Sequence, residues 1–197
     1  MPAAATCAHL AADHDLIGKA LGLLERIAIR FALEQAVRPD AVEWVVSFLG
    51  DFADREHQQA EEDMLFPALE RSAGPDELAL VRELQRDHQT ERARLHTMCE
   101  ALGDISAPGA QARFSEAARS YVSLMRQHVQ KENEHLFTLA NRLLTESEDE
   151  KVSNRLAPQG SSDGAHRRER YAAALAHWSS QLGADQRSPL GAPTNTA

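Results

Sequence analysis

The chain has 197 residues, which is enough for one domain with an appendage. Its formal net charge of −9 argues against nucleic acid or an anionic membrane as the main partner. Hydrophobic residues make up 43% of the chain, but no apolar run approaches the roughly eighteen residues of a membrane-spanning helix. The N-terminus lacks the basic stretch of a secretory signal and the two cysteines form no disulfide framework, so we expect a cytoplasmic protein.

The first half of the chain contains two long helical patterns. Residues 8–36 have apolar side chains at alternating spacings of three and four, which is typical of a bundle seam. Residues 40–72 follow Pro39, and proline is common at a helix start. Pro67 lies within this second pattern, and we expect it to kink the helix or fray its last turn.

Two further helical patterns cover 76–103 and 110–146, and turns rich in glycine and proline separate the segments. Short loops between long helices make neighbouring helices antiparallel. The sequence therefore predicts an all-α protein whose main domain, residues 8–146, is an up-down-up-down four-helix bundle.

The composition changes after this predicted bundle. Residues 147–164 are rich in Ser, Glu, Asp, Asn and Gly, and we expect an exposed polar linker. Residues 165–183 place apolar side chains on one face, which predicts an extra C-terminal helix. Residues 184–197 are rich in Pro, Gly, Ala and Thr, and we expect a disordered tail.

Two segments of the predicted bundle share an unusual motif. In each, a histidine and a glutamate are four residues apart, and Leu-Phe follows at the same offset: His57 with Glu61, and His128 with Glu132. Positions four apart lie on one helix face. Two such helices facing each other would surround one point with two imidazole and two carboxylate ligands.

Every predicted bundle helix has a histidine on its apolar seam: His14, His57, His88 and His128. Counted from the turns, their heights differ by three or four residues, or roughly 5–6 Å, which is within the size of a two-metal site. Imidazole with carboxylate suits iron, manganese or zinc better than calcium or magnesium. The alternative is that the histidines are core residues hydrogen-bonded to glutamates, but burying two glutamates without a cation would be costly.

With their neighbours, these residues resemble the bacterial hemerythrin-like proteins of the HHE cation-binding family. The matching pieces are Asp13-His14-Asp15, Phe52 to His57, Glu61 to Pro67, Asp87-His88, His128 to Asn133 and Leu136-Phe137. The resemblance implies a bundle that holds two iron ions in an oxo- or hydroxo-bridged di-iron centre. It also implies terminal ligands His14, His57, His88 and His128 and bridging ligands Glu61 and Glu132. Manganese or zinc remain alternatives to iron because metal selection depends on supply.

One position departs from the resemblance. Respiratory hemerythrins have a fifth histidine one turn after the third-helix ligand, and here that position is Arg92. The resulting four-histidine site argues against reversible dioxygen carriage. Arg92 either packs its stem at the bundle edge with its head in solvent, which we favour, or contributes to the site.

Other polar residues lie close to the motifs in sequence. His135, one turn after Glu132, can hydrogen-bond Glu132, act as an extra ligand, or be a partly buried core histidine. Gln58 can approach the metals. Glu62, Asp63 and Glu134 are expected on a solvated face.

The leading functional interpretation is a non-haem di-iron protein that binds dioxygen, nitric oxide or a related small oxidant such as peroxide, for sensing, scavenging or delivery. The alternative is a di-iron enzyme of nitrosative or oxidative stress defence, which reduces nitric oxide or peroxide or supplies iron for repair of iron–sulfur centres. Such an enzyme needs an electron donor or cysteine chemistry, and Cys7 and Cys99 are far apart in the sequence. Metal storage is the least favoured reading, and the sequence does not identify a protein partner.

Overall fold

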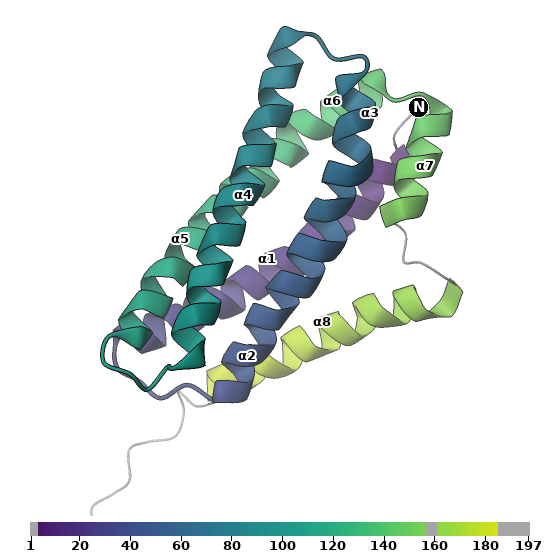
Figure 1. Ribbon diagram of the computed structural model, residues 1–197. Coiled ribbons are helices and arrows are strands. Elements are labelled where there is room, and N and C mark those ends of the chain that lie inside the picture. The colour runs from purple at the N-terminus through teal and green to yellow at the C-terminus, as the bar shows by residue number, and fades with distance from the viewer. Residues whose placement is uncertain (1–3, 157–160, 185–197) are drawn as a thin grey trace, which may run out of the picture.

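The computed structural model describes residues 4–156 and 161–184 of the chain. Within these residues all regular secondary structure is helical, and four long helical columns lie side by side (Figure 1). The first column is α1 (Ala4–Ala32) and the third is α4 (Pro75–Gly103). Short connections reverse the chain between successive columns, so the predicted all-α, up-down-up-down bundle is confirmed.

The second and fourth columns each contain π-helical segments. The second column consists of α2 (Pro39–Phe48), η1 (Leu49–Gln58), η2 (Glu61–Leu65) and α3 (Phe66–Glu70). The fourth consists of α5 (Ala110–Lys131), η3 (Glu132–Leu136) and α6 (Phe137–Leu143). π turns within α-helices are frequent at functional sites, and both His–Glu motifs lie in or beside these segments.

Pro67 lies in the first turn of α3, directly after η2. Proline has no backbone N–H and is tolerated there because that donor would be unsatisfied in any case. Just before it, the Phe66 N–H donates to the Glu61 carbonyl across a wide π turn. The helical column therefore continues past Pro67 to Glu70. Where the sequence predicted a kink or a frayed last turn, the structure has a π turn that begins at Glu61.

Buried polar side chains divide the apolar core into two clusters. The larger cluster includes Ile17, Ala53, Leu95 and Met125, and the smaller includes Leu10, Ala60, Leu84 and Leu136. Each seam histidine lies in sequence between a residue of one cluster and a residue of the other. The polar site therefore separates two apolar layers, which limits its contact with water.

The helix α7 (Glu146–Leu156) corrects the prediction of an exposed linker over 147–164. It begins with a capping box, in which the Thr145 N–H donates to Glu148 Oε2 at 3.0 Å and the Glu148 N–H donates to Thr145 Oγ1 at 3.3 Å. Its apolar face is short, and it packs in the smaller cluster through Val152 and Leu156. The polar composition hid this narrow face, although the Thr-x-x-Glu cap is visible in the sequence.

The C-terminal helix α8 (Ser161–Ala184) begins before the predicted boundary at residue 165. It runs obliquely along the bundle beside α1 and α2 (Figure 1). Leu175 and Leu182 are buried in the larger cluster, and the Tyr171 ring lies edge-on to Phe48 at 5.0 Å. Residues 157–160 of the predicted linker and 185–197 of the predicted tail lie outside the described residues. Among the described helices, none has the length and apolar character needed to cross a membrane.

Candidate metal centre

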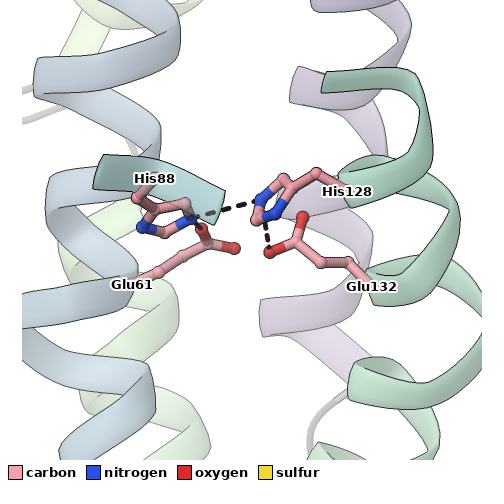
Figure 2. A group of neighbouring side chains, drawn as sticks. All are labelled: Glu61, His88, His128 and Glu132. Carbon is pink, nitrogen blue, oxygen red and sulfur yellow. Dashed lines mark hydrogen bonds and ion pairs between the residues drawn. The ribbon is translucent and has the colours of Figure 1, made fainter. Parts of the chain in front are cut away.

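All six residues predicted as ligands lie together between the two apolar clusters, with exposed fractions from 0% to 6%. Their nitrogen and oxygen atoms form two groups, in each of which the atoms lie within 4.8 Å of one another. One group is Glu61, His88, His128 and Glu132 (Figure 2), and the other is His14, His57 and Glu132. The two groups share Glu132.

The two glutamates each direct their oxygens toward histidines of different columns. Glu132 places Oε2 at 3.0 Å from His14 Nε2 and Oε1 at 3.1 Å from His128 Nε2. Glu61 places Oε1 at 3.9 Å from His57 Nε2 and Oε2 at 3.5 Å from His88 Nε2. A carboxylate that bridges two metal ions requires this arrangement.

Most of these inward-facing atoms lack an ordinary hydrogen-bond partner. Nε2 of His14 and His57 and both oxygens of Glu61 and Glu132 are inaccessible to solvent and form no hydrogen bond among the described residues. Buried polar atoms are normally paired. A cation in each group would satisfy them, so the residues present fit a pair of metal ions.

The outward Nδ1 atom of each histidine faces an oxygen. These oxygens belong to Asn133 (2.9 Å from His14), Asp13 (3.5 Å from His57), Glu62 (2.7 Å from His88) and Asp87 (3.7 Å from His128). A metal-binding histidine generally directs its second N–H to such a group, which fixes its tautomer and its orientation. Nε2 is then left free for the metal.

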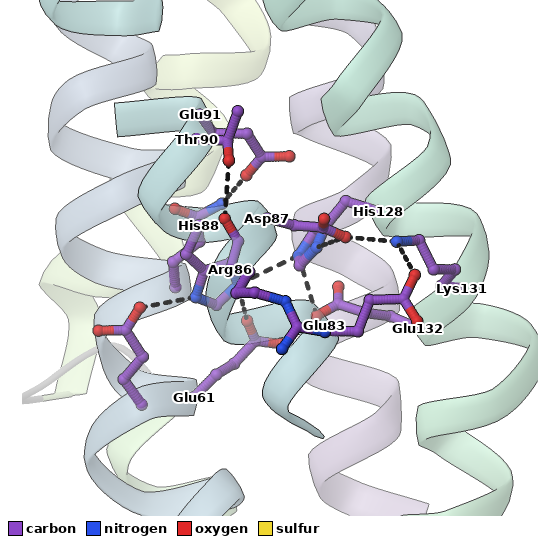
Figure 3. Close-up of polar contacts among 12 residues, drawn as sticks. Glu61, Glu83, Arg86, Asp87, His88, Thr90, Glu91, His128, Lys131 and Glu132 are labelled. Carbon is purple, nitrogen blue, oxygen red and sulfur yellow. Dashed lines mark hydrogen bonds and ion pairs between the residues drawn. The ribbon is translucent and has the colours of Figure 1, made fainter. Parts of the chain in front are cut away.

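Cationic side chains hold the three carboxylates among these oxygens. Arg168 donates to Asp13, the Arg92 guanidinium lies 2.9 Å from Glu62, and Lys131 lies 2.5 Å from Asp87. Figure 3 shows Asp87 between His128 and Lys131. The hydrogen bond from His88, assisted by Arg92, holds the pKa of Glu62 below its usual value. Glu62 therefore remains an ionised acceptor for His88.

The buried charges also perturb the protonation of the site. Burial alone lowers the pKa of His57, but Glu61, Asp13 and Glu132 outweigh it and raise the pKa to about 9. Burial is likewise outweighed at His128, chiefly by Glu132, and its pKa is raised well above the usual value. Metal binding must therefore displace protons from these imidazoles.

The structure corrects the prediction for His135. Its side chain is 62% exposed, and its nearest carboxylate is Glu134 at 4.0 Å, so it neither hydrogen-bonds Glu132 nor joins the ligand groups. The reason is local. His135 lies in η3, and a π turn rotates successive residues differently from the α-helix assumed in the sequence analysis.

Arg92 and Glu62 together connect the bundle edge to the site. The Arg92 side chain is 31% exposed, as expected at an edge, but its guanidinium pairs with Asp54 at 2.6 Å and with Glu62. Glu62 was expected on a solvated face, and instead it accepts a hydrogen bond from His88. Arg92 therefore acts on a predicted ligand indirectly.

Gln58 is buried and donates to Glu91 Oε2 at 2.5 Å, while Glu91 Oε1 accepts no hydrogen bond from any residue that the structure describes. Burial raises the pKa of the Glu91 carboxyl. Sequence reasoning missed Glu91, although it lies three residues after His88 and so on a similar helix face (Figure 3).

The fold and this buried cluster of histidines and glutamates define a metal-binding helical-bundle protein. The family model described as Hemerythrin HHE cation binding domain matches residues 3–140, and the chain belongs to this family. The helices α7 and α8 lie beyond the matched residues. No curated protein and no solved structure has significant similarity to the chain.

Proposed function

We propose that the chain is a non-haem di-iron protein that binds dioxygen, nitric oxide or a related small oxidant. The observation that supports this proposal is the placement of Glu61 and Glu132. Each glutamate directs one oxygen toward a histidine of the first ligand group and its other oxygen toward a histidine of the second group. Carboxylates that link two ions within a helical bundle are typical of di-iron proteins. Imidazole together with carboxylate is a ligand set that suits iron.

The burial of the site favours a ligand of a few atoms. Glu61, His88, His128 and Glu132 are 0% exposed. A surface hollow of about 720 Å³ lies elsewhere, lined by residues such as Phe31, Ile105 and Arg119, and none of the predicted ligands lines it. Four imidazole nitrogens and four carboxylate oxygens do not fill two octahedral ions, so a bound iron pair would offer redox chemistry and open coordination positions.

The protein's own residues have three roles in this proposal. Hydrogen bonds at Nδ1 orient His14 and His88, and the carboxylates of Asp13 and Asp87 face Nδ1 of His57 and His128, so that each Nε2 would point toward the metals. The two apolar clusters exclude bulk water from the site. Glu91 supplies a buried carboxyl group close enough for His88 and His128 to influence its pKa.

The test is to purify the protein anaerobically with iron, measure its metal content, and record optical spectra before and after adding air, nitric oxide or peroxide. We expect two iron ions per chain and new charge-transfer bands with at least one of the oxidants. His88→Ala should lose this response, whereas His135→Ala, which changes an exposed histidine, should keep it. One iron or fewer per chain, or unchanged spectra with all three oxidants, would contradict the proposal.

The same samples distinguish binding from turnover. Because Arg92 replaces a fifth histidine, we expect oxygen exposure to end in a stable oxidised form rather than in a durable reversible adduct. Repeated, fully reversible oxygenation would instead favour a carrier. Continuous consumption of nitric oxide or peroxide with an added reductant would favour the enzyme.

A further inference from the structure

The helix α8 lies outside the residues matched by the family model, yet its Arg168 contacts Asp13, which lies beside the candidate metal centre. Nε and Nη2 of Arg168 both donate to Asp13 Oδ1, at 2.9 and 2.5 Å. The other oxygen of Asp13 lies 3.5 Å from Nδ1 of His57. An added helix is therefore connected to a predicted ligand through a single carboxylate.

The burial of Asp13 makes this connection consequential. Asp13 is only 3% exposed, and an ionised carboxylate is costly to bury without a partner. Two hydrogen bonds from one guanidinium are strong and directional because both partners are charged. Arg168 therefore both compensates the charge of Asp13 and orients its second oxygen toward His57.

We propose that Arg168 is a positioning residue for the metal centre, and that the docking of α8 and the binding of metal at His57 are thermodynamically coupled through Asp13. This inference rests on the proposed function, because it requires His57 to be a metal ligand. Coupling between two sites is reciprocal. If Arg168 strengthens metal binding, metal must strengthen the docking of this end of α8 by the same factor.

Other contacts hold α8 independently of the site. Tyr171 packs on Phe48 and Phe52, and Arg26 donates to Ser179 at 2.9 Å. A change at Arg168 is therefore expected to loosen the link to Asp13 without releasing the whole helix. This separates the effect on the metal from a general loss of folding.

The neighbouring residue offers a matched control. Arg167 lies on the same helix and pairs with Glu56 at 2.6 Å, and Glu56 is not among the predicted ligands. Arg168→Gln and Arg167→Gln each remove one charge and, among the described contacts, one ion pair between α8 and the bundle. Among the described contacts, Arg168→Gln removes a partner of Asp13 and Arg167→Gln does not, whereas a purely structural role of α8 would affect both variants alike.

The experiment measures anaerobic Fe²⁺ binding to the full chain, with hydrogen exchange of the α8 amides before and after loading. We expect Arg168→Gln to weaken one of the two metal-binding steps by about 10- to 100-fold, the range typical for partners of ligating histidines. Arg167→Gln should leave both steps unchanged, and Arg168→Lys should restore part of the affinity. Loading should slow exchange near residue 168 in the wild type and less so in Arg168→Gln.

Equal metal affinities in Arg168→Gln and Arg167→Gln would overturn the inference while leaving the proposed function intact. Unchanged exchange of α8 on loading would overturn it as well. If Arg168→Gln unfolds, Arg168→Lys and the change Asp13→Asn provide the same comparison with smaller perturbations. A wild-type chain that binds no iron would instead refute the proposed function and, with it, this inference.

Discussion

The Nε2 atoms of His88 and His128 face each other at 3.2 Å in the interior of the bundle. The two rings meet edge to face, with centroids 4.7 Å apart. If both imidazoles carried protons, two like charges would adjoin in a poorly solvated core. Burial and the charge of His128 both lower the pKa of His88, but Glu61 and Glu62 outweigh them and raise it. Bound metal would relieve this conflict because each nitrogen would then donate its lone pair to a cation.

Metal removal should therefore destabilise the bundle without abolishing its helices. A ligand that binds only the folded state adds about 4 kcal/mol when its free concentration is a thousand times Kd. The two apolar clusters remain in the metal-free protein and should preserve helix. Circular dichroism and thermal unfolding with and without metal test this, and identical melting temperatures would contradict it.

The bridging and terminal ligands should differ in their effects. Glu61→Ala and Glu132→Ala should each impair the binding of both metals, because each glutamate has oxygens toward both ligand groups. His14→Ala should weaken one metal more than the other, because His14 belongs to one group. Stepwise titration with anaerobic Fe²⁺ resolves the two steps. Equal, partial loss of a single metal in all three variants would be inconsistent with these roles.

The metal-free protein should become less stable as the pH rises from about 6.5 to about 9. The pKa of His57 is raised from 6.5 to about 9, so its stabilising contribution is complete below 6.5 and is lost as the pH passes through 9. The loss from this residue is on the order of 3 kcal/mol. Chemical denaturation of the metal-free protein at several pH values measures it, and His57→Gln should flatten the dependence.

The same protons compete with metal. Iron affinity should therefore increase over this pH interval, while the stability of the metal-free protein decreases. If the iron affinity and the stability of the metal-free protein both increased with pH, the His57 imidazole would not be protonated in the metal-free site.

Glu91→Gln should stabilise the metal-free protein at neutral pH. Burial raises the pKa of Glu91, so the folded state disfavours the ionised form, and this cost is present above the usual pKa and disappears below it. A neutral amide should therefore raise the free energy of unfolding at pH 7 and change it little near pH 4. Glu83→Gln, which alters a half-exposed carboxylate, is the control. A destabilised Glu91→Gln at pH 7 would show that the negative charge is needed without metal.

Much of the architecture follows from local patterns in the sequence. The spacing of apolar residues and the turn residues predicted the four columns, because helix periodicity alone places a side chain on a face. The shared offset of His57 with Glu61 and of His128 with Glu132 predicted that each pair faces one point. The levels of the four seam histidines then predicted that the six side chains meet, and in the structure they do.

Contacts across the columns were decided only by the tertiary structure. Glu62 and Asp13 lie beside predicted ligands in the sequence, but their pairing with His88 and His57 depends on rotamers and packing between helices. His135 lies in the π turn of η3 and is exposed, and the residue pattern of the sequence did not predict this π turn. Arg168 is distant from Asp13 in the chain and reaches it only because α8 packs beside α1. The sequence by itself thus determined which helix faces bear the predicted metal ligands. The packing of the helices determined which oxygens face the Nδ1 atoms of the four histidines.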